Sequence, residues 1–264
     1  MPELPDVEVF RRYLDSTCLH QCIAEVETLD EGVLAGISSR QLRSKLKGQQ
    51  FQRTRRHGKY LFAGVHEHLW LVLHFGMTGY LKYFKDCDGA PRHTRLRVDF
   101  RNGHHLAYVC QRRLGEVGIT NDIERLVAEK GLGLDGLNAD LGIDSFKSLV
   151  GTARGSIKSA LMSQRRLAGL GNIYTDEILF QARVNPRAKA NRLTDGHLER
   201  LFHSVKDVVE TAIQAKAQPG DMPSTYLLPH REEGGVCPRC GGSLRHEKVS
   251  GRTSYYCPRC QGTT

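Results

Sequence analysis

The spacing of apolar positions changes near residue 120. Val7, Phe10, Tyr13 and Leu14 recur at helical spacing, which predicts a helix after Pro5. Short alternating stretches follow, separated by Gly, Asn and Asp, as is typical of strands. The predicted strands cover residues 21–28, 48–56, 59–65, 68–74, 79–84, 96–100 and 104–109. A single leading helix followed by strands predicts a sandwich or a flattened barrel.

From about residue 121 the apolar spacing becomes helical. The predicted helices cover residues 144–149, 156–164, 172–182 and 194–217, with Thr194 as the N-cap of the last. Pro and Gly interrupt residues 218–235, which are predicted to form a loop, and a small module begins at Val236. The pattern therefore predicts an α+β protein with parts at residues 1–120, 121–225 and 226–264.

The charge of the chain favours a polyanionic partner. Its 264 residues carry a formal net charge of +9, for which nucleic acid is the simplest partner. Residues 40–59 and 152–170 are basic and free of acids, so we expect folding to bring them into one phosphate-binding surface, although either run alone is also typical of a solvated face. There is no apolar run near the ~18 residues of a membrane span and no leader, which predicts a soluble, cytoplasmic protein without a membrane partner.

Two Cys-x-x-Cys pairs in the tail predict a zinc site. Cys237-Pro-Arg-Cys240 and Cys257-Pro-Arg-Cys260 each place two thiolates on a tight turn, so that four can meet at one tetrahedral ion. Because four cysteines leave no position for water, the ion is predicted to be structural; a redox pair is the alternative. Residues 245–256 fit a hairpin with its turn at Ser250-Gly251 and with Arg252 at its tip. The cysteines expected to be reduced are Cys18, Cys22, Cys87 and Cys110.

The first residues have the chemistry of a nucleophile. Removal of Met1 gives Pro2 a free secondary amine, and α-amino groups have a pKa of about 7.7–8.0, which leaves a usable unprotonated fraction at neutral pH. Such an amine attacks an electrophilic carbon and forms an iminium ion that has no N–H proton to lose. Glu3 is a neighbouring carboxyl able to move protons. A disordered chain end is the ordinary alternative.

Four further stretches favour a nucleic-acid contact, and each is equally typical of an ordinary turn. The glycines before Asn172 make a compact turn whose amides can face an anion, and Asn172 can cap the next helix. A basic turn leads to Lys59. Met77 and Leu114 lie in glycine-containing loops and are side chains of the kind that wedge between bases.

Together these pieces resemble the formamidopyrimidine-DNA glycosylase/endonuclease VIII family. Six motifs match in order: the Pro-Glu-Leu-Pro start, the Gly-Lys-Tyr strand, the Gly-Met loop, the Arg-Arg loop, the Gly-Leu-Gly-Asn-Ile-Tyr turn and the four-cysteine tail. The resemblance implies an N-terminal β-sandwich with a leading helix, a helical helix–two-turns–helix domain, and a C-terminal zinc-finger β-hairpin. It further implies a base-excision repair glycosylase with AP lyase activity and one structural Zn²⁺. The implied partner is double-stranded DNA with an oxidised base or an abasic site, bound by a monomer in the bacterial cytoplasm.

The resemblance implies a role for each matching residue. Pro2 would attack C1′ of the damaged nucleotide, and Glu3 would be the proton donor at the sugar. Lys59 would contact phosphate and assist β-elimination, and Arg252 would assist δ-elimination. The side chains implied to fill the gap left by the flipped lesion are Met77, Arg112 and Leu114. Further DNA contacts are implied at His74, His93, Arg113, Arg154 and Asn172.

Several positions depart from the family pattern. Asp6 replaces the usual second glutamate of the opening motif, Cys110-Gln111 replaces Asp-Pro, and Leu114 replaces a phenylalanine. Residues 223–235 do not match the loop that covers the lesion in 8-oxoguanine enzymes. Both oxidised purines (8-oxoguanine, formamidopyrimidine) and oxidised pyrimidines therefore stay open as substrates.

Two other functions compete with a glycosylase. A non-catalytic protein that binds damaged DNA could use the same scaffold, but binding needs no N-terminal amine. A translation-associated zinc-ribbon protein would explain the tail and the charge but not the first eight residues.

Overall fold

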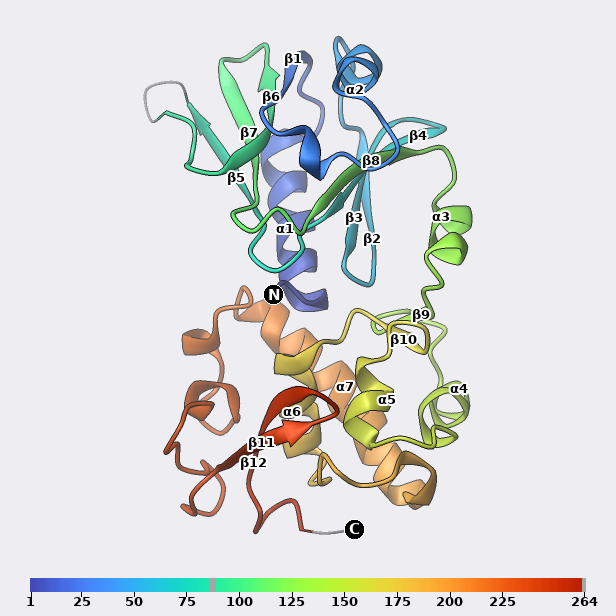
Figure 1. Ribbon diagram of the computed structural model, residues 1–264, viewed down its shortest axis with the longest axis vertical. Coiled ribbons are helices and arrows are strands. Elements are labelled where there is room, and N and C mark those ends of the chain that lie inside the picture. Colours follow the sequence, from blue (N-terminus) through green and yellow to red (C-terminus); the bar gives the residue numbers. More distant parts are fainter. Residues whose placement is uncertain (86–88, 263–264) are drawn as a thin grey trace. The chain divides into compact units, whose positions relative to one another are not determined.

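The chain folds into two compact units. The computed structural model describes residues 1–85 and 89–262, so the expectation for Cys87 falls outside the described residues. The first unit consists of Met1–Pro2 and Asp6–Lys130, and the second of Glu3–Pro5 and Gly131–Thr264 (Figure 1). Cys18, Cys22 and Cys110 are free thiols, as predicted.

Two four-stranded antiparallel sheets form the body of the first unit, which confirms the predicted β-sandwich. One sheet has the order β1-β6-β7-β5 and the other β2-β3-β4-β8. The strands of the first sheet are β1 (Ile23–Thr28), β6 (Thr94–Phe100), β7 (His104–Val109) and β5 (Tyr80–Lys85). Those of the second sheet are β2 (Arg53–His57), β3 (Tyr60–His66), β4 (Leu69–His74) and β8 (Glu116–Thr120).

The leading helix, α1 (Leu4–Cys18), is present as predicted, but it is not the only helix before residue 120. A second helix, α2 (Ser39–Leu46), lies between β1 and β2 in the chain. Ser38 and Gln41 close its N-terminus as a capping box, and Leu42 and Leu46 are buried. The prediction of a single helix is therefore wrong. The Ser-x-x-Gln signal was present in the sequence, among basic residues that obscure the apolar pattern.

A buried ion pair joins α1 to strand β2. Glu8 on α1 lies 3.3 Å from the guanidinium of Arg56, whose side chain is 6% exposed. Burial acts to raise the pKa of Glu8, but Arg11, Arg12 and Arg56 outweigh it and lower the pKa. An adjacent face of α1 packs Val7, Leu14 and Cys18 into the sandwich core.

The second unit is built around a helix that is buried on every side. That helix is α6 (Asn172–Gln181), whose residues from Tyr174 to Phe180 are all buried. Against it pack α5 (Ile157–Met162), α7 (Asp195–Gln214) and the strand β12 (Arg252–Tyr256), which forms a hairpin with β11 (Arg245–Val249) (Figure 1). The short helix α4 (Ile143–Phe146) packs against α7. Thr194 caps α7, as predicted. The remaining elements are α3 (Ile123–Glu129) in the first unit and the short strands β9 (Leu134–Asp135) and β10 (Leu167–Ala168).

Across residues 1–85 and 89–262, no helix combines the length and the apolar character needed to cross a bilayer.

Candidate functional site

The carboxylate of Glu3 closes the N-terminus of α6. Its side chain is buried, and its two oxygens accept the N–H groups of Gly171 at 2.8 Å, Ile173 at 2.9 Å and Tyr174 at 3.3 Å. These are N–H groups that a helix cannot satisfy internally, and the helix dipole favours an anion there. The expectation that Asn172 caps this helix is therefore wrong, because Glu3 supplies the cap from a distant part of the sequence.

The glycines of the preceding turn make room for the first residues of the chain. A Cβ atom on Gly171 would lie 2.4 Å from the carboxyl carbon of Glu3, and one on Gly169 would lie 2.6 Å from Leu4. Gly169 also has φ of 110°, which a side chain disfavours. The predicted anion-facing turn is thus present, and the anion it faces is Glu3.

We expect Glu3→Gln to lower the free energy of unfolding of the second unit by about 2 kcal/mol. An amide offers one acceptor oxygen where the carboxylate offers two, so at least one buried N–H loses a partner worth about 1.5–3 kcal/mol. Urea unfolding monitored by circular dichroism measures the change. Glu210→Gln, on the exposed side of α7, is the control that should leave the midpoint unaltered. If the unfolding midpoint of Glu3→Gln were as unaltered as that of Glu210→Gln, the capping role of Glu3 would be contradicted.

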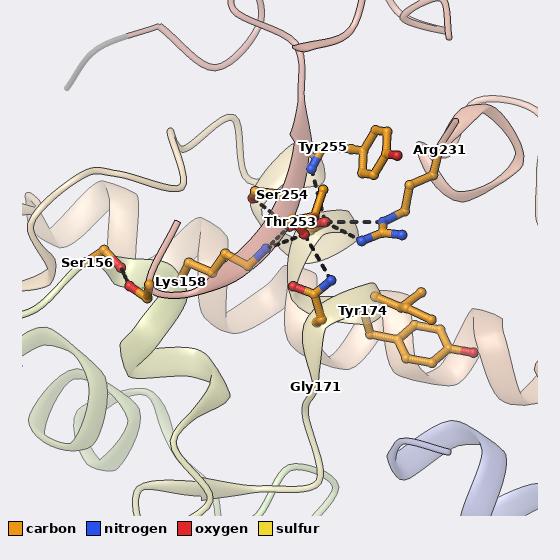
Figure 2. Close-up of polar contacts among 12 residues, drawn as sticks. Ser156, Lys158, Gly171, Tyr174, Arg231, Thr253, Ser254 and Tyr255 are labelled. Carbon is orange, nitrogen blue, oxygen red and sulfur yellow. Dashed lines mark hydrogen bonds and ion pairs between the residues drawn. The ribbon is translucent and has the colours of Figure 1, made fainter. Parts of the chain in front are cut away.

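Asp176 on α6 attaches the hairpin to this helix. Figure 2 labels its four partners, Lys158, Arg231, Ser254 and Tyr255. One of its oxygens accepts from Nζ of Lys158 at 2.7 Å and from the hydroxyl of Ser254 at 2.8 Å. The other accepts from the N–H of Tyr255 at 3.1 Å and from Arg231 at 2.8 Å. The side chains of Lys158 and Asp176 are fully buried. Burial lowers the pKa of Lys158, against the attraction of Asp176.

The tip of the hairpin is fixed at the start of α6 and α5. Asn172 donates from Nδ2 to the carbonyl of Thr253 at 2.9 Å, and the hydroxyls of Ser156 and Ser250 lie 2.9 Å apart. Ser250 and the glycine after it have φ of 50° and 77°, which is the geometry of a two-residue hairpin turn. The predicted hairpin and its turn are confirmed.

Three predicted site residues therefore gather near the N-terminus of α6. Glu3 caps it, Asn172 is its first residue, and the exposed Arg252 precedes Thr253 on the hairpin. Arg154 lies exposed in the turn before α5, two residues from Ser156. The sequence did not reveal Asp176 as part of this arrangement. The available signal is its position four residues after Asn172, on the same face of a helix that has few charged residues.

We expect Asp176→Asn to release the hairpin from α6. The amide keeps the shape of the side chain but leaves Lys158 buried without its counter-charge, which costs about 3–5 kcal/mol. Hydrogen exchange at the amide of Tyr255 should accelerate about 100-fold or more. Adding Lys158→Met removes the uncompensated charge and should restore much of the protection. Slow exchange that persisted in Asp176→Asn would show that the hairpin is held by other contacts.

In the first unit, Lys59 and His74 lie at the same end of the second sheet. Lys59 is in the two-residue turn between β2 and β3, and the next residue, Tyr60, pairs with His74 on β4. Burial lowers the pKa of His74 and outweighs the attraction of Glu116. Nδ1 of His74 accepts from the N–H of Gly76 at 3.4 Å. The neutral ring therefore carries its proton on Nε2, where it can donate.

The three predicted wedge residues lie together on two packed loops. The guanidinium of Arg112 is 3.4 Å from the sulfur of Met77, and its backbone N–H donates to Thr78 at 3.3 Å. A Cβ atom on Gly76 would lie 2.4 Å from the carbonyl carbon of Leu114, so only glycine allows this approach. Met77 is 37% exposed and Leu114 is 55% exposed, so both apolar side chains reach the surface of these packed loops.

The other predicted contacts of the first unit lie beside these loops. The carbonyl of His93 accepts the N–H of Cys110, which begins the Arg112 loop. Arg113 forms an ion pair with Asp30 at 2.7 Å, so part of its charge is already compensated. Pro2 is half-buried and is preceded by Met1, which makes its nitrogen part of an amide.

The four tail cysteines fit a zinc ion. Their sulfur atoms all lie within 4.8 Å of one another, with Cys237–Cys260 at 3.9 Å and Cys240–Cys257 at 3.5 Å. A tetrahedral site with Zn–S bonds of about 2.3 Å requires sulfurs about 3.8 Å apart. These residues therefore hold one structural Zn²⁺, whose role is to keep the two turns of the module together.

Comparison with known proteins assigns the chain to a family. Three family models match it: the formamidopyrimidine-DNA glycosylase N-terminal domain at residues 1–117, the H2TH domain of the same enzymes at 132–222, and the zinc finger found in FPG and IleRS at 234–262. The formamidopyrimidine-DNA glycosylases of Pelotomaculum thermopropionicum and Parasynechococcus marenigrum are 33% and 35% identical to it. Each alignment covers 99% of this chain, and 99% and 100% of the respective relative.

Solved structures agree with this assignment. The Lactococcus lactis formamidopyrimidine-DNA glycosylase, bound non-covalently to DNA that contains an AP site, is 28% identical with a TM-score of 0.89. The comparison covers 99% of this chain and 100% of that one. A complex of the same enzyme with DNA containing FAPY-dG gives the same identity and TM-score. The chain therefore belongs to the formamidopyrimidine-DNA glycosylase family.

Proposed function

We propose that Pro2, once Met1 has been removed, is the nucleophile of this base-excision repair DNA glycosylase and of its AP lyase activity. The observation that carries the proposal is the convergence of Glu3, Asn172 and Arg252 at the N-terminus of α6. That arrangement brings the residue next to Pro2 in the chain together with two residues able to hold phosphate. The complexes of the Lactococcus lactis relative with DNA that contains an AP site or FAPY-dG support such DNA as the ligand of this site.

The proposed reaction begins with attack of the Pro2 amine on C1′ of the damaged nucleotide. The bond between C1′ and the base breaks, the base leaves with its electron pair and gains a proton, and opening of the sugar ring yields an iminium ion. The iminium makes the protons on C2′ acidic. Loss of one of them expels the 3′ phosphate by β-elimination, and a second elimination expels the 5′ phosphate.

Two proton transfers are proposed for Glu3 in this reaction, where the sequence predicts only that it donates a proton. Three N–H donors and the helix dipole stabilise its ionised form. We infer that Glu3 first accepts the proton that the Pro2 nitrogen loses on attack and then returns it to the ring oxygen of the sugar. The predicted role as proton donor is kept, as the second half of a relay.

The basic and apolar loops fit the remaining steps. Lys59 and Arg252 are proposed to contact the phosphates that leave in β- and δ-elimination, and the neutral His74 is proposed to donate to a backbone phosphate. Met77 and Leu114 are proposed to enter the base stack where the lesion flips out, since both are exposed on loops that pack against each other. The remaining residues that are proposed to contact DNA are His93, Arg112, Arg113, Arg154 and Asn172.

The proposed substrate is duplex DNA that contains an oxidised base or an abasic site, bound by one copy of the chain in the bacterial cytoplasm. Within residues 223–235, the N–H groups of Leu227 and Leu228 donate to Glu177 at 3.1 and 2.7 Å, and Leu227 is fully buried. This segment is thus packed onto the second unit. The proposed lesion is an oxidised purine or an oxidised pyrimidine, because these contacts do not distinguish between the two.

Duplexes that each carry one 8-oxoguanine, one formamidopyrimidine or one oxidised pyrimidine test the proposal. We expect release of at least one of these bases, followed by strand cleavage that leaves phosphate on both sides of the gap. Tight binding to the same duplexes without base release would instead indicate a non-catalytic damage-binding protein.

A further inference from the structure

Four basic side chains line an open cavity at the base of the hairpin, away from its tip. The cavity has a volume of about 370 Å³ and is lined by Arg187, Lys189, Arg192 and Arg245, with Tyr256 at its side. All four cations are exposed. Arg187 forms an ion pair with Glu247. In the part of the chain that the structure describes, the other three cations have no acidic partner.

The cavity is built on a fixed framework. The carbonyl of Ala188 accepts the N–H of Ile157 at 2.7 Å, and the backbone of Lys189 pairs with that of Ser156. Asn185, 8% exposed, donates to the carbonyl of Gln261 in the zinc module at 3.0 Å. The loop of residues 185–192 is therefore tied to both α5 and the zinc module, so its backbone needs little ordering when the side chains bind a ligand.

The same framework connects the cavity to the tip of the hairpin. Ser156, which pairs with Lys189, also contacts Ser250 in the hairpin turn. Arg245 is at the far end of β11 from that turn. The four residue steps from Arg245 to Val249 span about 13 Å, a length close to four steps of B-DNA at about 3.4 Å each.

We propose that this cavity binds backbone phosphates of the DNA duplex about four nucleotides away from the phosphate held at the hairpin tip. The inference rests on the proposed function, because it takes DNA as the ligand. Guanidinium groups bind phosphate oxygens through paired hydrogen bonds, and two arginines without an acidic partner flank one lysine here. Continuity with the hairpin tip favours DNA over an acidic peptide.

The salt dependence of DNA binding tests this site. Lys189→Gln combined with Arg192→Gln is compared with the unmodified protein on a 30-base-pair duplex that carries a tetrahydrofuran abasic analogue. The slope of log K against log salt concentration should become shallower by about 1.8, since each lost phosphate contact contributes about 0.9. Kd should rise about tenfold or more at 0.1 M salt. Arg245→Gln should reproduce about half of the slope change.

Two controls separate this site from general loss of charge. On a second 30-base-pair duplex, with uncharged methylphosphonate linkages at the positions three to five nucleotides from the analogue on each side, the double variant should bind like the unmodified protein. Lys206→Gln with Lys216→Gln, which removes two charges in and after α7, should leave the slope on the fully charged duplex unaltered. An unchanged slope of the double variant on the fully charged duplex, or an equal loss of affinity on both duplexes, would overturn the proposed site.

The outcome is distinguishable from failure of the proposed function. Single-turnover strand cleavage at saturating concentration of the double variant should match that of the unmodified protein. Failure of the unmodified protein to cleave would overturn the function, whereas a normal rate with an unchanged salt slope would overturn only the cavity.

Discussion

Protein that retains Met1 is expected to release a damaged base and cleave the strand about 1,000-fold more slowly than protein that starts at Pro2. The nitrogen of Pro2 is part of an amide while Met1 is attached, and the lone pair of an amide is delocalised into the carbonyl. Loss of a covalent nucleophile commonly costs an enzyme three or more orders of magnitude. Single-turnover kinetics on a duplex with one oxidised base measures the difference.

A matched control is available in the same preparation. Treatment of the Met1 form with methionine aminopeptidase should restore the rate without any other change to the chain. Both forms should bind a tetrahydrofuran duplex within about twofold of each other, so that the comparison reports chemistry rather than affinity. Equal cleavage rates for the two forms would exclude Pro2 as the nucleophile.

Cys257→Ser should have the second largest effect. Cys257 is fully buried among the four sulfurs that hold Zn²⁺, and short zinc modules depend on the metal for folding. Loss of the metal frees β12, and with it the side chain of Arg252 at the start of that strand. Because removal of a placed charge from an active site costs about 100-fold or more, strand cleavage should fall by at least that factor.

The measurement pairs zinc content with the cleavage rate. Cys22→Ser changes a half-buried cysteine of the first unit and should leave both unaltered. If Cys257→Ser loses zinc and still cleaves at the normal rate, then Arg252 does not act from the position proposed for it.

The features that the sequence predicts correctly are each encoded by a few residues that lie close together in the chain. The hairpin turn follows from Ser-Gly between two strands, Thr194 precedes a regular apolar pattern, and the zinc site follows from paired Cys-x-x-Cys motifs. Each depends on a few adjacent residues, so spacing is enough to identify it. The loop around Met77 was predicted for the same reason, although its packing on Leu114 was not.

The features that could not be predicted depend on contacts between distant residues. Glu3 caps a helix 168 positions away, and Asp176 joins Lys158 to a hairpin nearly 80 positions further along. No periodicity links such residues, because the folded chain alone brings them together. Six motifs in the correct order identified the family, but they did not reveal how Glu3 is held.

The two basic runs show that charge in the sequence does not by itself identify the residues that are free to bind phosphate. In residues 40–59, Arg43 and Lys47 both pair with Glu25, and Arg55 pairs with Glu124. In residues 152–170, Lys158 is fully buried. Part of this charge is therefore compensated or buried within the fold, and the expectation that both runs form a phosphate-binding surface is too broad. The cations around Arg192 lie in neither run.

Borohydride reduction with abasic-site DNA, followed by mass spectrometry of the trapped peptide, tests the role of Pro2 most directly. Reduction converts the iminium ion into a stable amine and leaves the sugar attached to the attacking nitrogen. We predict that the attached mass maps to the N-terminal peptide, on the nitrogen of Pro2. An adduct on Lys59 or another lysine, or no adduct from fully processed protein, would contradict the proposed mechanism.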